Sequence, residues 1–363
     1  MKIVFYISNH GFGHASRCIP IINNLMKIND KLEVIIKSGS EQIDFIKNLI
    51  EEKSRVKFYK QNLDLGLVLK ENRCEIDNEK LKGKVIEYVN SWDILIQNEI
   101  EFLKQQNVKL IISDIVPWVF DVSKKLNIKS LLISNFIWTD IYEEIIESNI
   151  IDKFNQMYDL VDYVFYYPLS TKRMRSLKNS QSVGFSVREY DDRNIERIKQ
   201  THNRPIIYFS LGRSVDIDIE INVDKLSFDF YFTEGINITG QNTFRIEKST
   251  INTHDYIGAS DLVFTKAGYS TVAEAICSKK PMLVLERKDN SEDINTIKNL
   301  NRYFIIKTFT ISDLLDKQKI DNLIRSTIIL KQNYIYLKDL CKNDSINIAR
   351  KINIMINEGM ENE

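Results

Sequence analysis

The sequence predicts an α/β protein built from two doubly wound domains, each a parallel β-sheet with helices on both faces. Short apolar runs of strand length alternate with stretches whose apolar residues recur at helical spacing. Strands that alternate with helices in this way form parallel sheets covered on both sides. The 363 residues leave room for two or three domains. Because the alternation occurs in both halves, we expect the same architecture twice.

The first domain is expected to span residues 1–188. Its strands are predicted at residues 2–8, 31–37, 55–60, 109–113, 130–134 and 163–167. Between them, residues 81–105 have helical spacing, in one piece or two, and an aromatic-rich stretch from residue 136 is expected to be mostly helix. The polar stretch 171–204 ends in Asn203-Arg204-Pro205, which places the domain boundary between residues 188 and 204.

The second domain is expected over residues 205–311. Its strands are predicted at residues 206–210, 228–233, 243–247, 262–265, 282–286 and 303–307. Residues 215–221 alternate with period two where this architecture needs a helix, and the sequence does not resolve them. Residues 312–363 are largely helical without a core of their own, so we expect these helices to pack across both domains.

Composition excludes several classes of function. Lysine and arginine balance aspartate and glutamate, 50 against 50, whereas nucleic-acid-binding proteins usually carry a basic surplus. No apolar run reaches the length of a membrane span, and the N-terminus is typical of a strand rather than a signal peptide. Cys18, Cys74, Cys277 and Cys341 are too far apart for a close-spaced zinc motif. We therefore expect a cytoplasmic protein without a metal site.

The stretch from Asp261 to Ile276 carries the clearest candidate binding site. A buried strand is followed by a turn at Gly268 and then by a helix that begins at Ser270 or Thr271. Glycine lets a ligand approach the backbone, the first turn of a helix favours an anion, and Lys266 adds a positive charge. These features predict a diphosphate site. A structural alternative is a capping box, in which Thr271 caps the helix and Glu274 answers its backbone N–H.

The loop after the first strand carries the candidate catalytic residue. His10 and His14 are two of only four histidines, and Gly11 and Gly13 lie between them. Asp114 follows the fourth strand and Asn135 the next, at the sheet edge where parallel α/β sheets bind ligands. We predict that His14 is a general base oriented by Asp114. The alternative for Asp114 is a helix N-cap, since Pro117 comes three residues later.

Two motif regions resemble a known family. Asn9-His-Gly-Phe-Gly-His14 with Pro20, together with Thr265-Lys-Ala-Gly-Tyr-Ser-Thr-Val-Ala-Glu274, resembles the GT-B nucleotide-sugar glycosyltransferases. The chain is similar to the peptidoglycan N-acetylglucosaminyltransferase group and to the glycosyltransferase-like domain that precedes the kinase in arabinokinases. Residues 110–118 resemble the Asp-bearing segment of plant secondary-metabolite glucosyltransferases. The resemblance implies two Rossmann-like domains facing a cleft. It does not extend to the kinase part of the arabinokinases.

The resemblance also implies a role for each matching residue. Gly11 and Gly13 would approach the donor phosphates or the acceptor, and Gly212 and Arg213 would lie beneath the diphosphate. Gly268, Ser270 and Thr271 would hold the far oxygens of the diphosphate. Glu274 would bind the ribose hydroxyls, and Glu292 and Asp293 would contact the donor sugar. The family's usual glutamines are missing from the last segment, so the resemblance does not identify the sugar. The family works without a bound metal or a further cofactor.

The expected function is that of an inverting glycosyltransferase. It would move a sugar from a nucleoside-diphosphate sugar, expected to be UDP-linked, to a hydroxyl of a glycan, a lipid-linked molecule or a small molecule. No nucleic-acid partner is expected, and a peripheral contact with a membrane stays open. The stretch from Gly11 to Cys18 also resembles a nucleotide-sugar hydrolase of pseudaminic acid synthesis. A silent nucleotide-sugar binding protein is a third alternative.

Overall fold

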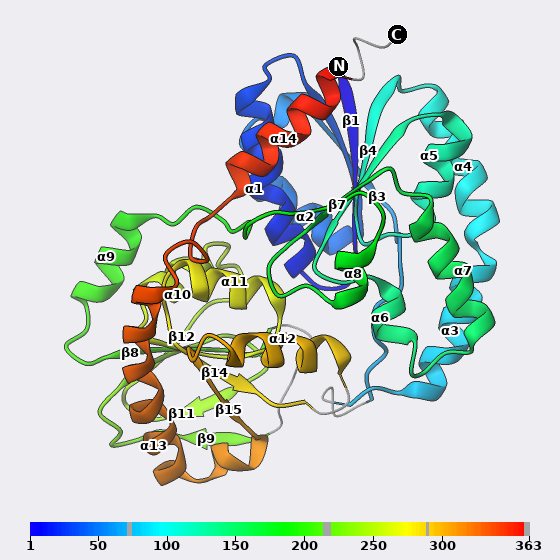
Figure 1. The fold of residues 1–363 in the computed structure, drawn as a ribbon. Coiled ribbons are helices and arrows are strands. Elements are labelled where there is room, and N and C mark those ends of the chain that lie inside the picture. The colour runs from blue at the N-terminus through cyan, green and yellow to red at the C-terminus, as the bar shows by residue number, and fades with distance from the viewer. Residues whose placement is uncertain (71–74, 213–218, 288–289, 359–363) are drawn as a thin grey trace. The chain divides into compact units, whose positions relative to one another are not determined.

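The computed structural model describes residues 1–70, 75–212, 219–287 and 290–358. The chain divides into two compact units (Figure 1). Unit 1 contains Met1–Val68, Asp77–Ser186 and the C-terminal stretch from Asn343. Unit 2 contains Leu69–Ile76 and Val187–Lys342. The chain therefore passes from the first main unit to the second between Ser186 and Val187, and it returns to unit 1 at its C-terminal end.

Unit 1 is built on one parallel sheet of seven strands in the order β3-β2-β1-β4-β5-β6-β7. The strands are β1 (Lys2–Ile7), β2 (Glu33–Ser38), β3 (Val56–Lys60), β4 (Val108–Asp114), β5 (Lys129–Ser134), β6 (Tyr163–Tyr166) and β7 (Ser180–Ser182). The direction of strand addition reverses between β1 and β4, which are hydrogen-bonded neighbours. Ile7 pairs with Asp114 at their carboxyl ends. The loop after β1 therefore lies beside Asp114, where open α/β sheets bind ligands.

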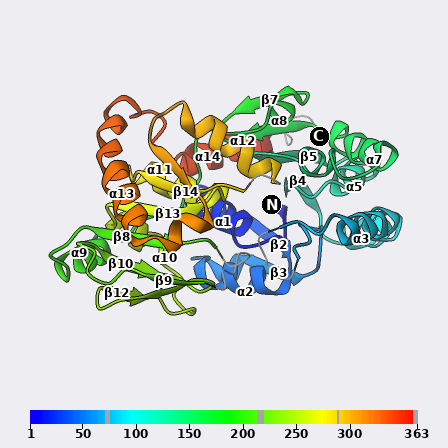
Figure 2. The same ribbon diagram turned by 90° about the horizontal axis from the view of Figure 1, so that it is seen from below.

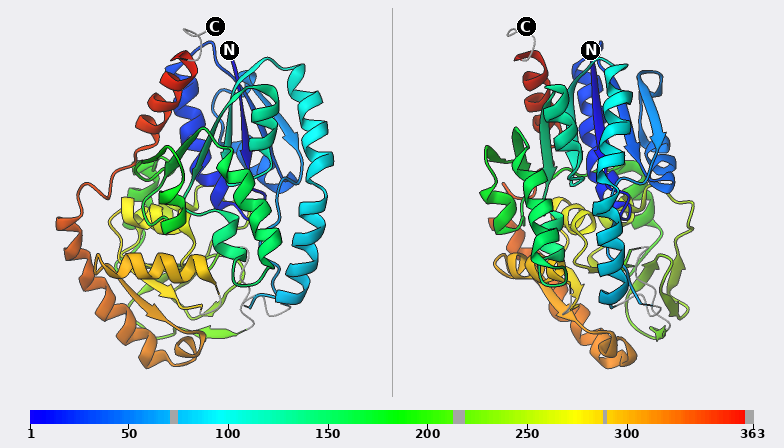
Figure 3. Two further views of the ribbon diagram at one scale, coloured as in Figure 1. Left: turned by 45° about the vertical axis from the view of Figure 1, so that its right-hand side comes forward. Right: turned by 90° about the vertical axis from the view of Figure 1, so that its right-hand side faces the viewer.

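Helices cover both faces of this sheet, as the alternation predicts. They are α1 (Gly13–Ile28), α2 (Ser40–Leu49), α3 (Asn78–Asn90), α4 (Trp92–Lys104), α5 (Val119–Leu126), α6 (Trp138–Tyr142), α7 (Ser148–Asp159), α8 (Lys172–Ser176) and α14 (Ser345–Glu358), with a 3₁₀ turn η1 (Lys53–Arg55). The predicted helix at 81–105 is two helices that meet at Ser91. The C-terminal helix α14 lies along α1 (Figure 3). Asn24 Nδ2 of α1 donates to Ser345 Oγ at 3.1 Å.

Unit 2 repeats the architecture with six parallel strands in the order β12-β10-β8-β13-β14-β15 (Figure 2). The strands are β8 (Ile206–Ser210), β10 (Asp229–Phe232), β12 (Thr243–Arg245), β13 (Leu262–Lys266), β14 (Met282–Leu285) and β15 (Ile306–Phe309). The strand predicted at 303–307 begins three residues late, because residues 301–304 continue the turn that ends the preceding helix. The prediction of two doubly wound α/β halves is confirmed.

Two crossovers of unit 2 carry strands at the places where the pattern calls for helices. β9 (Glu220–Asn222) follows β8, β11 (Asn237–Thr239) follows β10, and the two form a separate parallel pair. Ile221 and Ile238 are buried in the same apolar cluster as Phe209 of the main sheet. The period-two alternation at 215–221 therefore ends in a real strand that covers the sheet in place of a helix. Residues 215–218 of that stretch lie outside the described residues.

The remaining helices belong to unit 2. They are α9 (Asp192–Gln200), α10 (Thr253–Ala259), α11 (Tyr269–Cys277), α12 (Ser291–Asn301) and α13 (Lys317–Ile328), with 3₁₀ stretches η2 (Ile311–Leu315) and η3 (Ile329–Tyr336). Leu314, Ile320 and Ile324 join the apolar cluster of unit 2. The predicted group 312–363 is thus divided, with α13 in unit 2 and α14 in unit 1. None of the described helices has the length and hydropathy to cross a membrane.

Candidate functional site

His14 and Asp114 lie together in unit 1, as the sequence predicts. His14 is in the first turn of α1, and Asp114 is the last residue of β4. His14 Nδ1 is 3.1 Å from Asp114 Oδ1, and both side chains are buried. The adjacent carboxyl ends of β1 and β4 produce this contact, because α1 begins directly after the loop that leaves β1. The helix-cap alternative for Asp114 is wrong, since α5 begins only at Val119.

Arg17 is the main residue of this site that the sequence analysis missed. It follows His14 by one turn of α1, and its Nε donates to Asp114 Oδ2 at 2.9 Å while its Nη2 donates to Asp114 Oδ1. Nη1 donates to Asn135 Oδ1 at 2.5 Å. Bidentate pairing of this kind is among the strongest charge-assisted contacts in proteins. The signal was available as a cation three residues after His14, on the same helix face.

The cation of Arg17 decides the ionisation of Asp114. Burial alone would raise the pKa of this carboxyl group, because a charge is costly to desolvate. Arg17 and His14 oppose that effect, and the pKa of Asp114 falls to about 2. Asp114 is therefore a carboxylate at neutral pH. The pKa of Arg17 is in turn raised by Asp114, although burial opposes this shift. The pair is a fixed, fully buried feature of the site.

The glycine loop between β1 and α1 is held by a second buried carboxylate, Asp64. Asp64 Oδ1 accepts from the backbone N–H of Asn9 at 3.1 Å, and Oδ2 accepts from Trp138 Nε1 at 3.1 Å. Burial raises the pKa of Asp64, and interactions with residues that include His14 lower it. The sequence analysis missed Asp64 because it lies in a stretch without helical or strand periodicity. It places a further acidic group beside the candidate base.

Gly11 and Gly13 of this loop occupy structurally different positions. Gly11 has a φ of 77°, in the left-handed region that side chains disfavour, and a Cβ there would meet no described residue within 4 Å. Gly13 begins α1. The imidazole ring of His10 lies close against Gly66, where any Cβ would clash with it. The fold therefore holds His10 against the backbone, and His14, not His10, faces Asp114.

Gly212, Lys266 and Gly268 lie together at the carboxyl ends of β8 and β13 in unit 2. A Cβ built on either glycine would lie 3.3 Å from Lys266 Cε, so the lysine side chain runs close to both. Gly212 has a φ of 73°, which favours glycine by itself. Burial, followed by the charge of Arg287, lowers the pKa of Lys266. Arg213, the predicted neighbour of Gly212, lies outside the described residues.

Helix α11 begins at Tyr269, with Gly268 as its N-cap. The first intrahelical bond runs from Val272 N to Gly268 O, so the N–H groups of Tyr269, Ser270 and Thr271 have no acceptor within the helix. Gly268 has no side chain with which to cap them. The capping-box alternative is wrong, because Thr271 lies inside the first turn. The positive end of the helix dipole lies at this turn, and the predicted diphosphate site there stays a prediction.

Glu274 is bound to Arg188 through one of its two carboxylate oxygens. Its Oε1 accepts from Arg188 Nε at 3.0 Å and from Nη2 at 2.8 Å. No described residue donates to Oε2. Arg188 also donates from Nη1 to the carbonyl of Ile251 at 2.8 Å, which ties α11 to the loop before α10. Sequence reasoning noted Arg188 only as part of the polar linker. The geometry leaves one carboxylate oxygen to accept from a ligand hydroxyl.

Glu292 and Asp293 are in the first turn of α12, close enough to affect the pKa of Lys266. Asp293 is buried, and its two oxygens accept from Arg287 Nε at 2.6 Å and Nη2 at 2.9 Å. Asp293 therefore resembles a structural partner of Arg287 more than an open ligand. Glu292 is partly exposed. Their predicted contact with the donor sugar stays a prediction.

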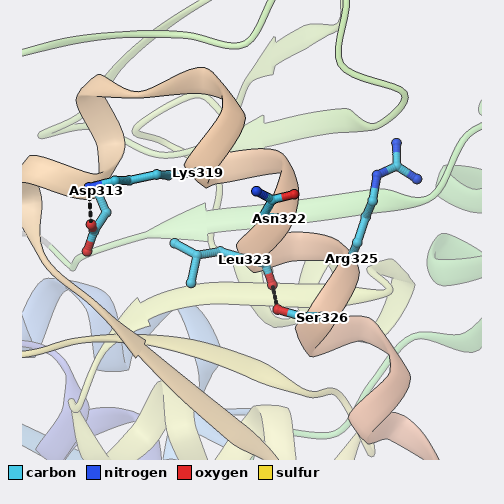
Figure 4. A pocket seen from close by; sticks show the side chains of 6 residues that line it. All are labelled: Asp313, Lys319, Asn322, Leu323, Arg325 and Ser326. Carbon is cyan, nitrogen blue, oxygen red and sulfur yellow. Dashed lines mark hydrogen bonds and ion pairs between the residues drawn. The ribbon is translucent and has the colours of Figure 1, made fainter.

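A separate hollow of unit 2 contains none of these residues (Figure 4). Its lining comes from η2 and α13 and consists of Asp313, Lys319, Asn322, Leu323, Arg325 and Ser326. Lys319 Nζ is 3.4 Å from Asp313 Oδ1, and Arg325 Nε is 2.8 Å from Asp321 Oδ2. Because these charges are paired on the surface, the hollow offers no concentrated charge to a ligand.

Comparison with protein sequences gives one curated relative. No family model matches the chain. The chain is 24% identical over 338 residues to L-arabinokinase of Arabidopsis thaliana, which covers 84% of this chain and 30% of that protein. The chain thus spans less than a third of the length of the curated relative. The likeness agrees with the resemblance to the domain that precedes the kinase.

Comparison with solved structures covers nearly the whole chain. The calicheamicin glycosyltransferase matches with a TM-score of 0.67 at 10% identity over 98% of both chains. Spinosyn rhamnosyltransferase matches at 0.67 and 11% identity, over 97% of this chain and 100% of that one. UDP-glucose:anthocyanidin 3-O-glucosyltransferase, solved with UDP, matches at 0.68 and 12% identity over 98% and 99%. The chain therefore has the GT-B fold of these glycosyltransferases, as its motifs predicted.

Proposed function

We propose that the protein is an inverting glycosyltransferase that moves a sugar from a UDP-linked donor to an acceptor hydroxyl. The observation that carries the proposal is the buried contact between His14 and Asp114 at the carboxyl ends of β1 and β4. In a chain with the GT-B fold, a histidine beside an ionised carboxylate is a suitable general base.

In the proposed reaction, His14 Nε2 removes the proton of the acceptor hydroxyl. The acceptor oxygen then bonds to the anomeric carbon of the sugar from the face opposite the diphosphate. The bond between that carbon and the diphosphate oxygen breaks, and the nucleoside diphosphate leaves with the electron pair. Asp114, ionised at neutral pH, stabilises the imidazolium that forms. No metal ion or further cofactor takes part in this proposal.

The donor is proposed to bind unit 2. The first-turn N–H groups of α11 and the ammonium group of Lys266 would stabilise the charge that develops on the leaving diphosphate. Gly212 and Gly268 keep the backbone open to it. The open Oε2 of Glu274 would accept from a ribose hydroxyl. Arg213, Glu292 and Asp293 are further proposed donor contacts.

The experiment is a transfer assay with UDP-hexoses and UDP-pentoses against a panel of hydroxyl acceptors. Because the relative is named for arabinose, L-arabinose and UDP-arabinose belong in the panel. We expect release of UDP that depends on the acceptor, with one new glycoside as product. Release of free sugar without an acceptor would instead indicate a hydrolase, and UDP binding without turnover of any donor would indicate a binding protein.

His14→Ala is the matching variant for this assay. Turnover should fall by about 10²–10⁴-fold, the usual contribution of a general base. UDP affinity should stay close to that of the parent, because the nucleotide is proposed to bind unit 2. His202→Ala, a histidine of unit 2 bound to Asp229 and Tyr231, serves as the control for loss of an imidazole. Near-normal turnover in His14→Ala would remove the base assignment.

A further inference from the structure

We propose that Arg17 is a positioning residue: it holds Asp114 as an oriented carboxylate, which keeps the proton of neutral His14 on Nδ1, so that Nε2 is the free base. The role in turnover rests on the proposed function. The position of the proton does not, since it can be measured without any substrate. The inference starts from the three acceptors that surround one nitrogen of Arg17.

The hydrogens of Arg17 Nη2 can be counted. This nitrogen carries two N–H groups. It lies within hydrogen-bond distance of three atoms, namely Asp114 Oδ1, Ser134 Oγ at 3.1 Å and His14 Nδ1 at 3.0 Å. When His14 Nδ1 carries a proton of its own, Asp114 Oδ1 and Ser134 Oγ accept the two hydrogens of Nη2. No hydrogen of Nη2 is then left for His14.

Asp114 is ionised and can only accept, so His14 Nδ1 provides the hydrogen of the contact between them. The two atoms are 3.1 Å apart, and a carboxylate oxygen can accept from both Arg17 and His14. The proton of a neutral imidazole is thus on Nδ1, and Nε2 has the lone pair. If the proton were on Nε2 instead, the lone pair of Nδ1 would face the carboxylate, and Nε2 would have no lone pair with which to accept a substrate proton.

Arg17 is held firmly enough to impose this arrangement. Its Nη1 donates to Asn135 Oδ1 at 2.5 Å, and its guanidinium carbon lies 5.4 Å from the centre of the Tyr167 ring. Its backbone carbonyl accepts from Ser186 Oγ at 2.7 Å. Lysine has a single ammonium group and cannot reproduce this planar set of donors. Arg17→Lys should therefore keep the charge but lose the geometry.

Charge gives the direction of the effect on pH dependence. The groups that face His14 and its partner Asp114 are Arg17 and Cys18 from α1, and Asp64 from the stretch after β3, with Tyr167 against Arg17. Burial raises the pKa of the Cys18 thiol well above its usual value, so Cys18 is neutral. Without Arg17, Asp114 would be a buried carboxylate facing Nδ1 with no cation beside it. Such a charge favours imidazolium, so His14 would stay protonated to higher pH.

The test is nuclear magnetic resonance of the ¹⁵N-histidine-labelled full chain over a range of pH. The chain has four histidines, and the signals that disappear in His14→Gln belong to His14. We expect neutral His14 of the parent to carry its proton on Nδ1. In Arg17→Met, the second proton should be taken up at higher pH than in the parent, and Arg17→Lys should fall between the two.

Lys37→Met is the matched control, because Lys37 is also a buried cation of unit 1. Its Nζ donates to both oxygens of Glu99, at 2.8 and 2.6 Å, away from His14. It should leave the His14 titration unchanged. In transfer assays, Arg17→Met should lower kcat at neutral pH by about 10²-fold, with little change in the donor KM, and should move the acid limb of the pH–rate profile to higher pH.

Two results would overturn the inference. One is a parent protein whose neutral His14 carries its proton on Nε2, and this measurement needs no variant to fold. The other is a folded Arg17→Met in which His14 titrates as in the parent. If the resonance data agree with the inference but no sugar is transferred under any condition, the proposed function fails and the role of Arg17 in proton placement stands.

Discussion

Asp114 gives a prediction with a sign opposite to that of Arg17. In Asp114→Asn, the carboxylate beside His14 Nδ1 is lost while Arg17 keeps its positive charge. Imidazolium becomes less favourable, so the acid limb of the pH–rate profile should move to lower pH. Turnover at neutral pH should still fall, by less than in His14→Ala, because the ring loses its orientation. A limb that moves to higher pH, or does not move, would contradict the assigned contact.

Glu274 gives a prediction about nucleotide binding. Glu274→Gln removes the negative charge of the carboxylate that is proposed to accept from the ribose. UDP should then bind more weakly by about 1–3 kcal/mol, the scale of a hydrogen bond to a charged group. Some stability should also be lost, because Arg188 keeps a buried charge without a counter-ion. Calorimetric titration and melting of the same variant separate the two effects. Glu247→Gln, at an exposed glutamate of unit 2, is the control. Unchanged affinity with lower stability would show that Glu274 is only structural.

Single residues mark the limit of what the sequence predicts. His14 and Asp114 were predictable because each follows a strand whose length and apolar character are evident. Arg17 could be suspected from its spacing to His14, but its partner and that of Arg188 could not be predicted, because the carboxylates lie 97 and 86 residues away in the chain. Both capping alternatives failed for a local reason, because α5 begins only at Val119 and α11 begins at Tyr269 with Gly268 as its N-cap. Contacts between distant buried charges depend on packing that no local pattern contains.

At the scale of an element, the turn into α11 tests where the diphosphate binds. Gly268 has a φ of −65°, which other residues adopt, so Gly268→Val should fold, with a loss of about 1 kcal/mol for a poor N-cap residue. The new side chain would displace Lys266, whose Cε lies 3.3 Å from the added Cβ, and block the approach to the helix end. UDP binding should be abolished. Gly83→Val, where nothing lies within 4 Å, is the control for the substitution itself. Parental UDP affinity would place the diphosphate elsewhere.

The contact of α10 with the segment after residue 187 predicts how unit 2 responds to acid. Burial, followed by the charge of Arg188, lowers the pKa of His254 to about 4. Its Nε2 donates to the carbonyl of Glu189 at 2.8 Å, and the buried Nδ1 has no hydrogen-bond partner among the residues that the structure describes. The unfolded chain takes up the proton near pH 6.5, so stability should be lost as the pH falls from about 6.5 to 4, by up to about 3 kcal/mol. His254→Gln should flatten this part of the stability curve, as measured by urea unfolding. An equal slope in both proteins would contradict the assigned burial.

Elements also show why part of the fold was not predictable. The strands of both sheets follow from apolar runs, and α1 follows from its buried stripe of Ile19, Ile22 and Leu25. The pair β9–β11 has three-residue strands whose partners lie 17 residues apart. Strands this short show little periodicity in the sequence, and their apolar residues become buried only when they pack on the sheet. The return of α14 to α1 is likewise a contact between the two ends of the chain.

For the whole molecule, we propose that a chain with the GT-B fold and the His14–Asp114 pair transfers sugars with inversion. The most direct measurement is the anomeric configuration of the product formed from an α-linked UDP-sugar, read from the coupling of its anomeric proton. We predict that the parent protein forms a β-linked glycoside and that His14→Ala forms almost no glycoside. An α-linked product, or equal product from His14→Ala, would contradict it.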